Sequence, residues 1–254
     1  MKTLRDFVLS GEFLIAAHRG ASGLAPENTI PAFELAVNEG ANMIETDIHF
    51  TTDGHIVAFH DFDHLKKSNN IDFAETNTLE EIRQIDVGSW FNPKFAGEKV
   101  PTLQEILEFA KDKTYLNFEI KTNNSRIDDI KIKKLIDIIH DYDMMDFLMF
   151  SSFNYGLIKL IKSLDSKIHT AAINIPNQKL LPSQLAIETK ADAFICSIDE
   201  LNEVINQDIT DNNIFLAVYS IDNEEQLEYI KKFNVSALGT NFPARIKGLI
   251  KNNL

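Results

Sequence analysis

Residues Asn42–Phe50, with the sequence NMIETDIHF, decide the fold of this chain. β-Branched and aromatic residues predominate in this stretch and charged side chains alternate with uncharged ones, which predicts a β-strand. Successive side chains of a strand point to opposite faces, so Glu45, Asp47 and His49 share one face. Neighbouring carboxylates repel each other and resist burial, unless they share a cation. A solvated acidic face is the alternative for such a pair in isolation.

The segment before this strand predicts a second, parallel strand. Residues Phe13–Ala17 form a short apolar run, as expected of a strand buried on both faces. A helix follows, for which Thr29 or Asn28 can serve as the N-cap residue and Pro31 lies in the first turn. This strand, helix and Asn42–Phe50 together form a βαβ unit.

The segment after Asn42–Phe50 predicts a β-hairpin. An Asp53-Gly54 turn separates it from another strand pattern at residues 55–61. The connection is too short for a parallel crossover, so the two strands should be antiparallel. If Thr52 faces His55, the register places Asp47 opposite His60.

The remainder of the chain alternates strands and helices and predicts a (β/α)8 TIM barrel. Residues 51–100 interrupt the alternation and are interpreted as the hairpin plus a small insertion within a single domain, residues 1–254. One predicted helix lies near Glu200–Ile205. The later strands are expected at Tyr115–Ile120, Phe147–Ser152, Lys167–Ile173, Ala193–Ser197, Ile214–Tyr219 and Val235–Gly239.

The composition excludes several classes of protein. The net charge of −13, without a compensating basic stretch, argues against a nucleic-acid binder. Cys196 is the single cysteine, so an internal disulfide is excluded and a reducing compartment is expected. Glu12 interrupts the apolar run near the N-terminus, which argues against a signal peptide, and no run approaches the ~18 apolar residues of a membrane span. These features predict a cytoplasmic protein without stable membrane insertion; the oligomeric state is left open.

Three acidic residues are expected to meet inside the barrel. Functional groups of TIM barrels lie at the C-terminal ends of the strands, where Glu45 and Asp47 are joined by Glu119 of the next parallel strand. An all-oxygen ligand set suits one hard divalent cation, Ca²⁺ or Mg²⁺. Salt bridges to Arg19 and Lys121 are the alternative way to neutralise these carboxylates.

The same strand ends carry cationic and titratable groups. Arg19 and Lys121 are suited to binding an anion, and the guanidinium fork of Arg19 matches phosphate oxygens. His18 and His60 have unperturbed pKa values near neutrality, as a general acid/base pair requires. Taken alone, His18 could instead be a strand-end histidine that bonds a backbone carbonyl.

Several motifs together are more specific than any one of them. They are HRG (His18–Gly20), PENT (Pro26–Thr29), ETD (Glu45–Asp47), TTDG (Thr51–Gly54), HD (His60-Asp61), GSWF to VPTLQEIL (Gly88–Leu107), NFEIK (Asn117–Lys121), SSFN (Ser151–Asn154) and GTNFP (Gly239–Pro243). As a set, they resemble the glycerophosphodiester phosphodiesterase family over nearly the whole chain.

The resemblance implies a metal-dependent barrel hydrolase that cleaves small-molecule glycerophosphodiesters to glycerol 3-phosphate and an alcohol. It implies that Glu45, Asp47 and Glu119 are metal ligands. It also implies that His18 and His60 are the acid/base pair and that Arg19 and Lys121 bind phosphate.

Two positions depart from the family pattern. Tyr219-Ser220 replaces a common Trp-Thr pair, and Thr240-Asn241 replaces a common Thr-Asp pair. Tyr219 is expected in the wall of the substrate pocket, and Phe153 either lines that pocket or packs in the core. Both departures bear on substrate preference.

Alternatives remain at several points. A lipid phosphodiesterase of the sphingomyelinase D type resembles the family in the same motifs, and a barrel that binds phosphodiesters without turnover belongs to another class. Water or the substrate's own glycerol hydroxyl could be the nucleophile. Glu27 could contact the metal site.

Overall fold

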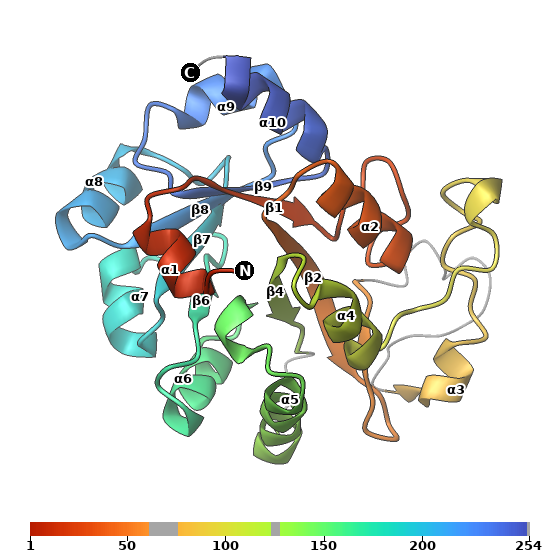
Figure 1. The fold of residues 1–254 in the computed structure, drawn as a ribbon. Helices are drawn as coiled ribbons and strands as arrows, with labels where there is room; N and C mark the ends of the chain where they lie inside the picture. The colour runs from red at the N-terminus through yellow and green to blue at the C-terminus, as the bar shows by residue number, and fades with distance from the viewer. Residues whose placement is uncertain (61–75, 123–127, 253–254) are drawn as a thin grey trace.

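The strands form a closed barrel in the computed structural model, which describes residues 1–60, 76–122 and 128–252 (Figure 1). Within these ranges one sheet has nine strands in the order β1-β9-β8-β7-β6-β5-β4-β2-β3, and pairing of β1 with β2 closes it. All pairs are parallel except β2 with β3. The strands are β1 (Leu14–His18), β2 (Met43–Phe50), β3 (Ile56–Ala58), β4 (Tyr115–Ile120), β5 (Leu148–Ser152), β6 (Thr170–Ile173), β7 (Ala193–Ser197), β8 (Phe215–Tyr219) and β9 (Ala237–Thr240).

Helices surround the barrel, and the predicted (β/α)8 fold is confirmed (Figure 1). Among the described residues, no helix is both long and apolar enough to span a bilayer. The helices are α1 (Leu4–Leu9), α2 (Ile30–Asn38), α3 (Leu79–Ile82), η3 (Pro93–Phe95), α4 (Leu103–Ala110), α5 (Asp129–Asp141), η4 (Met145–Phe147), α6 (Tyr155–Leu164), α7 (Pro182–Thr189), α8 (Glu203–Asn212), α9 (Glu224–Ile230) and α10 (Pro243–Asn252).

The main core lies between the outer faces of the strands and the helices. Ile44, Phe118 and Phe150 are fully buried there, and the rings of the two phenylalanines lie 6.3 Å apart. At the N-terminal end of the barrel, Leu4 and Phe7 of α1 pack against a ring of strand residues, Leu14, Met43, Tyr115 and Ala237. Helix α1 therefore closes this end of the barrel.

The parallel register places the predicted site residues side by side. His18 is the register partner of Glu45, and Asp47 is the partner of Glu119. Alternation along β2 and β4 turns Glu45 and Glu119 toward the pocket inside the barrel. Polar and titratable groups from three strands therefore meet at one end.

The hairpin is antiparallel, as predicted, but its predicted register is wrong by one residue. Ile48 pairs with Ala58, and the N–H of Phe59 donates to the carbonyl of Asp47 at 2.9 Å, so Asp47 is not opposite His60. The reason is the turn. Thr51, not Thr52, closes it by accepting a hydrogen bond from the N–H of His55 at 2.8 Å. The result is a three-residue loop ending in Gly54 at φ +80, where a two-residue turn was predicted.

One helix begins later than predicted. The helix expected near Glu200–Ile205 is α8, which begins at Glu203 because Asn202 caps it by accepting from the N–H groups of Val204 and Ile205. The carboxylate of Glu200 instead accepts from the backbone and hydroxyl of Ser197 in the preceding turn. Local side-chain bonds of this kind compete with helix formation.

Candidate active site

The loop after β1 aims the backbone of Arg19 at the acidic residues. Arg19 has φ +56, a left-handed conformation in which its N–H donates to Glu45 Oε2 at 2.9 Å. Gly20 follows at φ +81, where an added Cβ would lie 2.7 Å from the carbonyl carbon of Ala32 on α2. Gly20 therefore allows this loop to pack closely against the helix.

The three predicted metal ligands form a buried acidic cluster. Glu45, Asp47 and Glu119 each offer a carboxylate oxygen, and these oxygens lie within 4.8 Å of one another. Burial, followed by the neighbouring Asp47 carboxylate, raises the pKa of both Glu45 and Glu119. Burial also opposes ionisation of Asp47, but Lys121 and Arg19 outweigh it and lower the pKa of Asp47 to about 2.

Two cations lie against this cluster. Arg19 Nε is 3.2 Å from Asp47 Oδ2, while Arg19 Nη1 donates to Glu27 at 2.9 Å. Lys121 Nζ is 2.9 Å from Asp47 Oδ1 and also contacts Glu119. Burial disfavours the charge of Lys121, but the carboxylates of Asp47 and Glu119 outweigh it and raise the pKa of its ammonium group. Both cations stay charged at neutral pH.

Arg19 and Lys121 do not satisfy the whole cluster. Oε1 of Glu45 is buried and has no hydrogen-bond partner among the described residues. An unsatisfied buried carboxylate oxygen beside two further carboxylates is costly, and a hard divalent cation is the ligand that such oxygens bind. The residues therefore fit the divalent cation that the sequence predicts.

Asn28 belongs to this site, whereas the sequence pattern predicted a possible helix cap. Its Nδ2 donates to Asp47 Oδ2 at 2.9 Å, and its Oδ1 accepts from Thr46 Oγ1 at 2.7 Å. Thr29 is the N-cap residue of α2, with Pro31 in the first turn. Glu27 bonds Arg19 and not the acidic cluster itself. In the sequence, only the residue type pointed to a special role for position 28. Asparagine tolerates the left-handed conformation that Asn28 adopts, with φ +56.

A hydrogen-bond network from β9 orients His18. Its Nδ1 lies 2.9 Å from Asn241 Oδ1, and Asn241 Nδ2 donates to Asp222 at 2.6 Å. Ser22 Oγ also donates to Asn241 Oδ1, at 2.7 Å. Because Asp222 fixes the amide with its oxygen toward His18, Nδ1 of His18 must donate the proton. Nε2 then carries the lone pair.

The environment keeps His18 neutral. Burial and then the positive charge of Arg19 lower the pKa of its imidazole. The ring of Tyr219 lies nearly parallel to it, with the ring centroids 6.5 Å apart. Sequence reasoning placed His18 at the site but did not find Asp222 and Asn241 as its partners.

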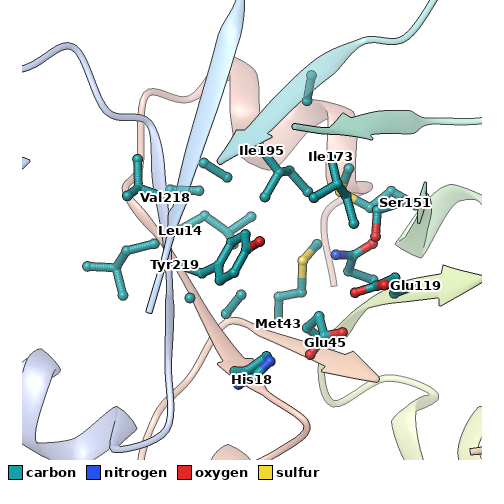
Figure 2. Close-up of a pocket in the computed structure, with 18 of the residues that line it drawn as sticks. Leu14, His18, Met43, Glu45, Glu119, Ser151, Ile173, Ile195, Val218 and Tyr219 are labelled. Atoms are coloured by element: carbon teal, nitrogen blue, oxygen red, sulfur yellow. The ribbon is translucent and has the colours of Figure 1, made fainter. Parts of the chain in front are cut away.

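One pocket brings the remaining predicted residues together (Figure 2). Its lining includes His60, Phe153 and Tyr219 together with His18, Arg19, Lys121, Glu45 and Glu119. Figure 2 labels Tyr219, His18 and the two glutamates. Asp47 is buried against Arg19 and Lys121 and does not line the pocket itself. Strand β3 ends at Ala58, and His60 lines the pocket although it is not opposite Asp47. His49, which shares the predicted strand face with Glu45 and Asp47, is buried and does not line the pocket. Asp61, of the predicted HD motif, lies outside the described residues.

Comparisons of sequence and structure identify known proteins that resemble this chain. A model of the glycerophosphoryl diester phosphodiesterase family matches residues 18–245. The chain is 33% identical over 243 residues to a glycerophosphodiester phosphodiesterase of Caldanaerobacter subterraneus, covering 94% of this chain and 98% of that protein. A glycerophosphodiester phosphodiesterase of Bacillus subtilis is 29% identical over 258 residues, with 91% and 84% covered.

A solved structure shows the same fold. An Oleispira antarctica phosphodiesterase in complex with its product sn-glycerol-3-phosphate has a TM-score of 0.87 and 26% sequence identity, with 96% of this chain and 99% of that chain covered. The family match and the identity to curated relatives extend over most of the chain. This chain belongs to the glycerophosphoryl diester phosphodiesterase family and is an enzyme of that type.

Proposed function

We propose that this enzyme hydrolyses glycerophosphodiesters to sn-glycerol 3-phosphate and an alcohol with the help of one divalent cation, Ca²⁺ or Mg²⁺. The observation that carries the proposal is the cluster of Glu45, Asp47 and Glu119, whose two glutamates line one pocket together with His18 and His60. The product in the Oleispira antarctica structure supports the choice of substrate.

The acidic cluster would hold the cation and the two basic residues would hold the substrate. A bound divalent cation supplies Lewis-acid stabilisation of the negative charge on the phosphoryl oxygens. Arg19 and Lys121, held in place by Glu27, Asp47 and Glu119, bind the non-bridging oxygens of the phosphodiester. Phe153 and Tyr219 line the pocket beside them.

The two histidines transfer the protons. His18 acts as the general base, because its Nδ1 proton is donated to Asn241 and its lowered pKa leaves Nε2 able to accept a proton. It deprotonates the attacking oxygen nucleophile. His60 then protonates the departing alcohol from another part of the pocket lining.

The test is release of glycerol 3-phosphate from several glycerophosphodiesters with Ca²⁺, with Mg²⁺ and with EDTA. Activity should require the metal, and His18→Ala and His60→Ala should each lower kcat by roughly 10²–10⁴. His55→Ala is the control, because His55 is exposed on the hairpin turn.

The same assay tests the rivals. Sphingomyelin and lysophospholipids as the preferred substrates would favour the lipid-directed enzyme. Tight binding of glycerophosphodiesters without turnover would favour a binding protein. Full activity in EDTA after dialysis would contradict the role of the metal.

A further inference from the structure

The interior of the barrel beside the acidic cluster is lined in part by small side chains. TIM-barrel interiors are typically filled by bulky branched residues. Here small residues on four neighbouring strands, β1, β9, β8 and β7, line the pocket together with larger apolar residues of the same strands, such as Leu14 and Ile195. These small residues are Ala16, Gly239, Ala237, Ala217 and Ala193.

The small residues leave a hollow inside the barrel. On β8 the inward-facing Ala217 and Tyr219 are partly exposed, whereas the outward-facing Leu216 and Val218 are fully buried. The whole pocket, including the part lined by His18, Arg19 and Lys121, measures about 220 Å³. Leu14 and Met43 line its inner end. Leu4 and Phe7 of α1 pack against these two residues from the N-terminal end of the barrel.

The hollow has a polar wall and an apolar wall (Figure 2). Glu45, Glu119 and Ser151, on β2, β4 and β5, lie on one side of the view, and Leu14 and Tyr219 lie across from them. Ile195 lies between the two sides, and Ile173 lies next to Ser151. On the polar wall, Asn117 Oδ1 and Ser151 Oγ are buried and lack hydrogen-bond partners among the described residues. Hydroxyl groups of a ligand, or water, would satisfy them.

The apolar wall suits an uncharged hydrocarbon group. A dry apolar cavity of ~150 Å³ is large enough to bind a molecule the size of benzene. An ammonium group in this part of the hollow would lose its hydration without gaining a carboxylate partner, since the carboxylates that line the pocket belong to the opposite wall. The hollow therefore favours alkyl over ammonium-bearing alcohols.

We infer that the small-residue wall of β1, β7, β8 and β9 binds the alkyl part of the substrate's alcohol, and that the enzyme prefers glycerophosphodiesters of uncharged apolar alcohols. This inference rests on the proposed function for the reaction, but the binding of an alkyl phosphate to the hollow can be measured without turnover. The glycerol hydroxyls remain on the polar wall.

The first experiment measures binding of n-alkyl phosphates to the wild-type enzyme by calorimetry, in Mg²⁺, from ethyl to hexyl phosphate. Each buried methylene should lower Kd about 4-fold, so butyl phosphate should bind about 15-fold more tightly than ethyl phosphate. A Kd that does not change with chain length would overturn the inference.

The second experiment fills the hollow. In Ala217→Leu the dependence of Kd on chain length should disappear, and Ala193→Val, a smaller change, should reduce it. Ala244→Leu is the matched control, because Ala244 is exposed on α10, and it should retain the wild-type dependence. The same dependence in all variants would place the alkyl group elsewhere and contradict the inference.

Turnover of glycerophospho-n-alkanols, glycerophosphocholine and glycerophosphoethanolamine separates the inference from the proposed function. Hydrolysis of all three without preference for the alkyl compounds leaves the reaction intact and overturns the alkyl site. Tight binding of alkyl phosphates without hydrolysis of any diester supports the alkyl site and rejects the reaction.

Discussion

Oδ1 of Asn241 lies 2.9 Å from Nδ1 of His18, and the carboxylate of Asp222 holds the amide in that orientation. The amide oxygen can only accept a hydrogen bond, so this contact selects one tautomer of the imidazole. The side-chain amide of Asn241 lies between the His18 ring and the negative charge of Asp222. His18 is thus oriented by a neutral group, and its pKa is not raised by a directly bonded carboxylate.

Asn241→Leu should remove the hydrogen bond that holds the His18 ring in its orientation. Leucine has a similar size but cannot accept the Nδ1 proton, so the preference for one tautomer is lost. We expect kcat to fall about 10–10²-fold, as for loss of a group that orients a catalytic base, with a smaller change in KM. The ¹⁵N shifts of the His18 ring report the tautomer directly. Wild-type shifts together with reduced activity would contradict this role.

The pH dependence of kcat/KM in the wild type should reflect the lowered pKa of His18. Burial and Arg19 favour the neutral imidazole, and a general base must be neutral to act. Activity should therefore persist as the pH falls below 6.5 and be lost only at the lowered pKa. A pH profile at saturating Mg²⁺ measures this limb. An acidic limb above pH 6.5 that is absent in His18→Ala would show that the pKa is raised.

Glu45→Gln should abolish metal binding and stabilise the metal-free protein. The raised pKa of Glu45, and the lack of a hydrogen-bond partner for its Oε1 in the part of the chain that the structure describes, indicate that the charged form is disfavoured without a cation. The neutral amide removes that repulsion while keeping the shape. In EDTA the mutant should melt at a higher temperature than the wild type, whereas metal at 100 times Kd should stabilise only the wild type, by about 2.7 kcal/mol.

The control for Glu45→Gln is Glu105→Gln, because Glu105 pairs with Arg83 and is not one of the three clustered carboxylates. It should keep the wild-type response to metal. If apo Glu45→Gln melts at a lower temperature and neither protein responds to Ca²⁺ or Mg²⁺, the acidic cluster is not a metal site.

Cys196 should be unreactive in the folded protein. It is fully buried, and burial, with a smaller effect of Glu200, raises the pKa of its thiol to about 12. The thiolate is the reactive species, so at pH 8 only a minute fraction can react. A disulfide reagent should label Cys196 slowly in the native state and rapidly in denaturant. Rapid native labelling would place the thiol in a more accessible position.

Local patterns in the sequence were sufficient to predict the barrel and the acidic cluster. Alternation along Asn42–Phe50 identified a strand, and the strand–helix rhythm predicted the parallel barrel. All parallel strands end at the same edge, so residues at the ends of β1, β2 and β4 meet without further information. Because of that geometric rule, the sequence by itself groups Glu45, Asp47 and Glu119.

Only the tertiary structure decided how the site residues are oriented. Asn241 reaches His18 across 223 positions of sequence, and Asn28 reaches Asp47 across 19, through side-chain contacts that no periodicity encodes. The register of the hairpin depended on the hydrogen bonds of Thr51, since a two-residue and a three-residue loop have similar sequences. The hollow beside the acidic cluster arises because small residues of four neighbouring strands lie side by side on one wall, and that depends on packing between distant segments, not on local sequence.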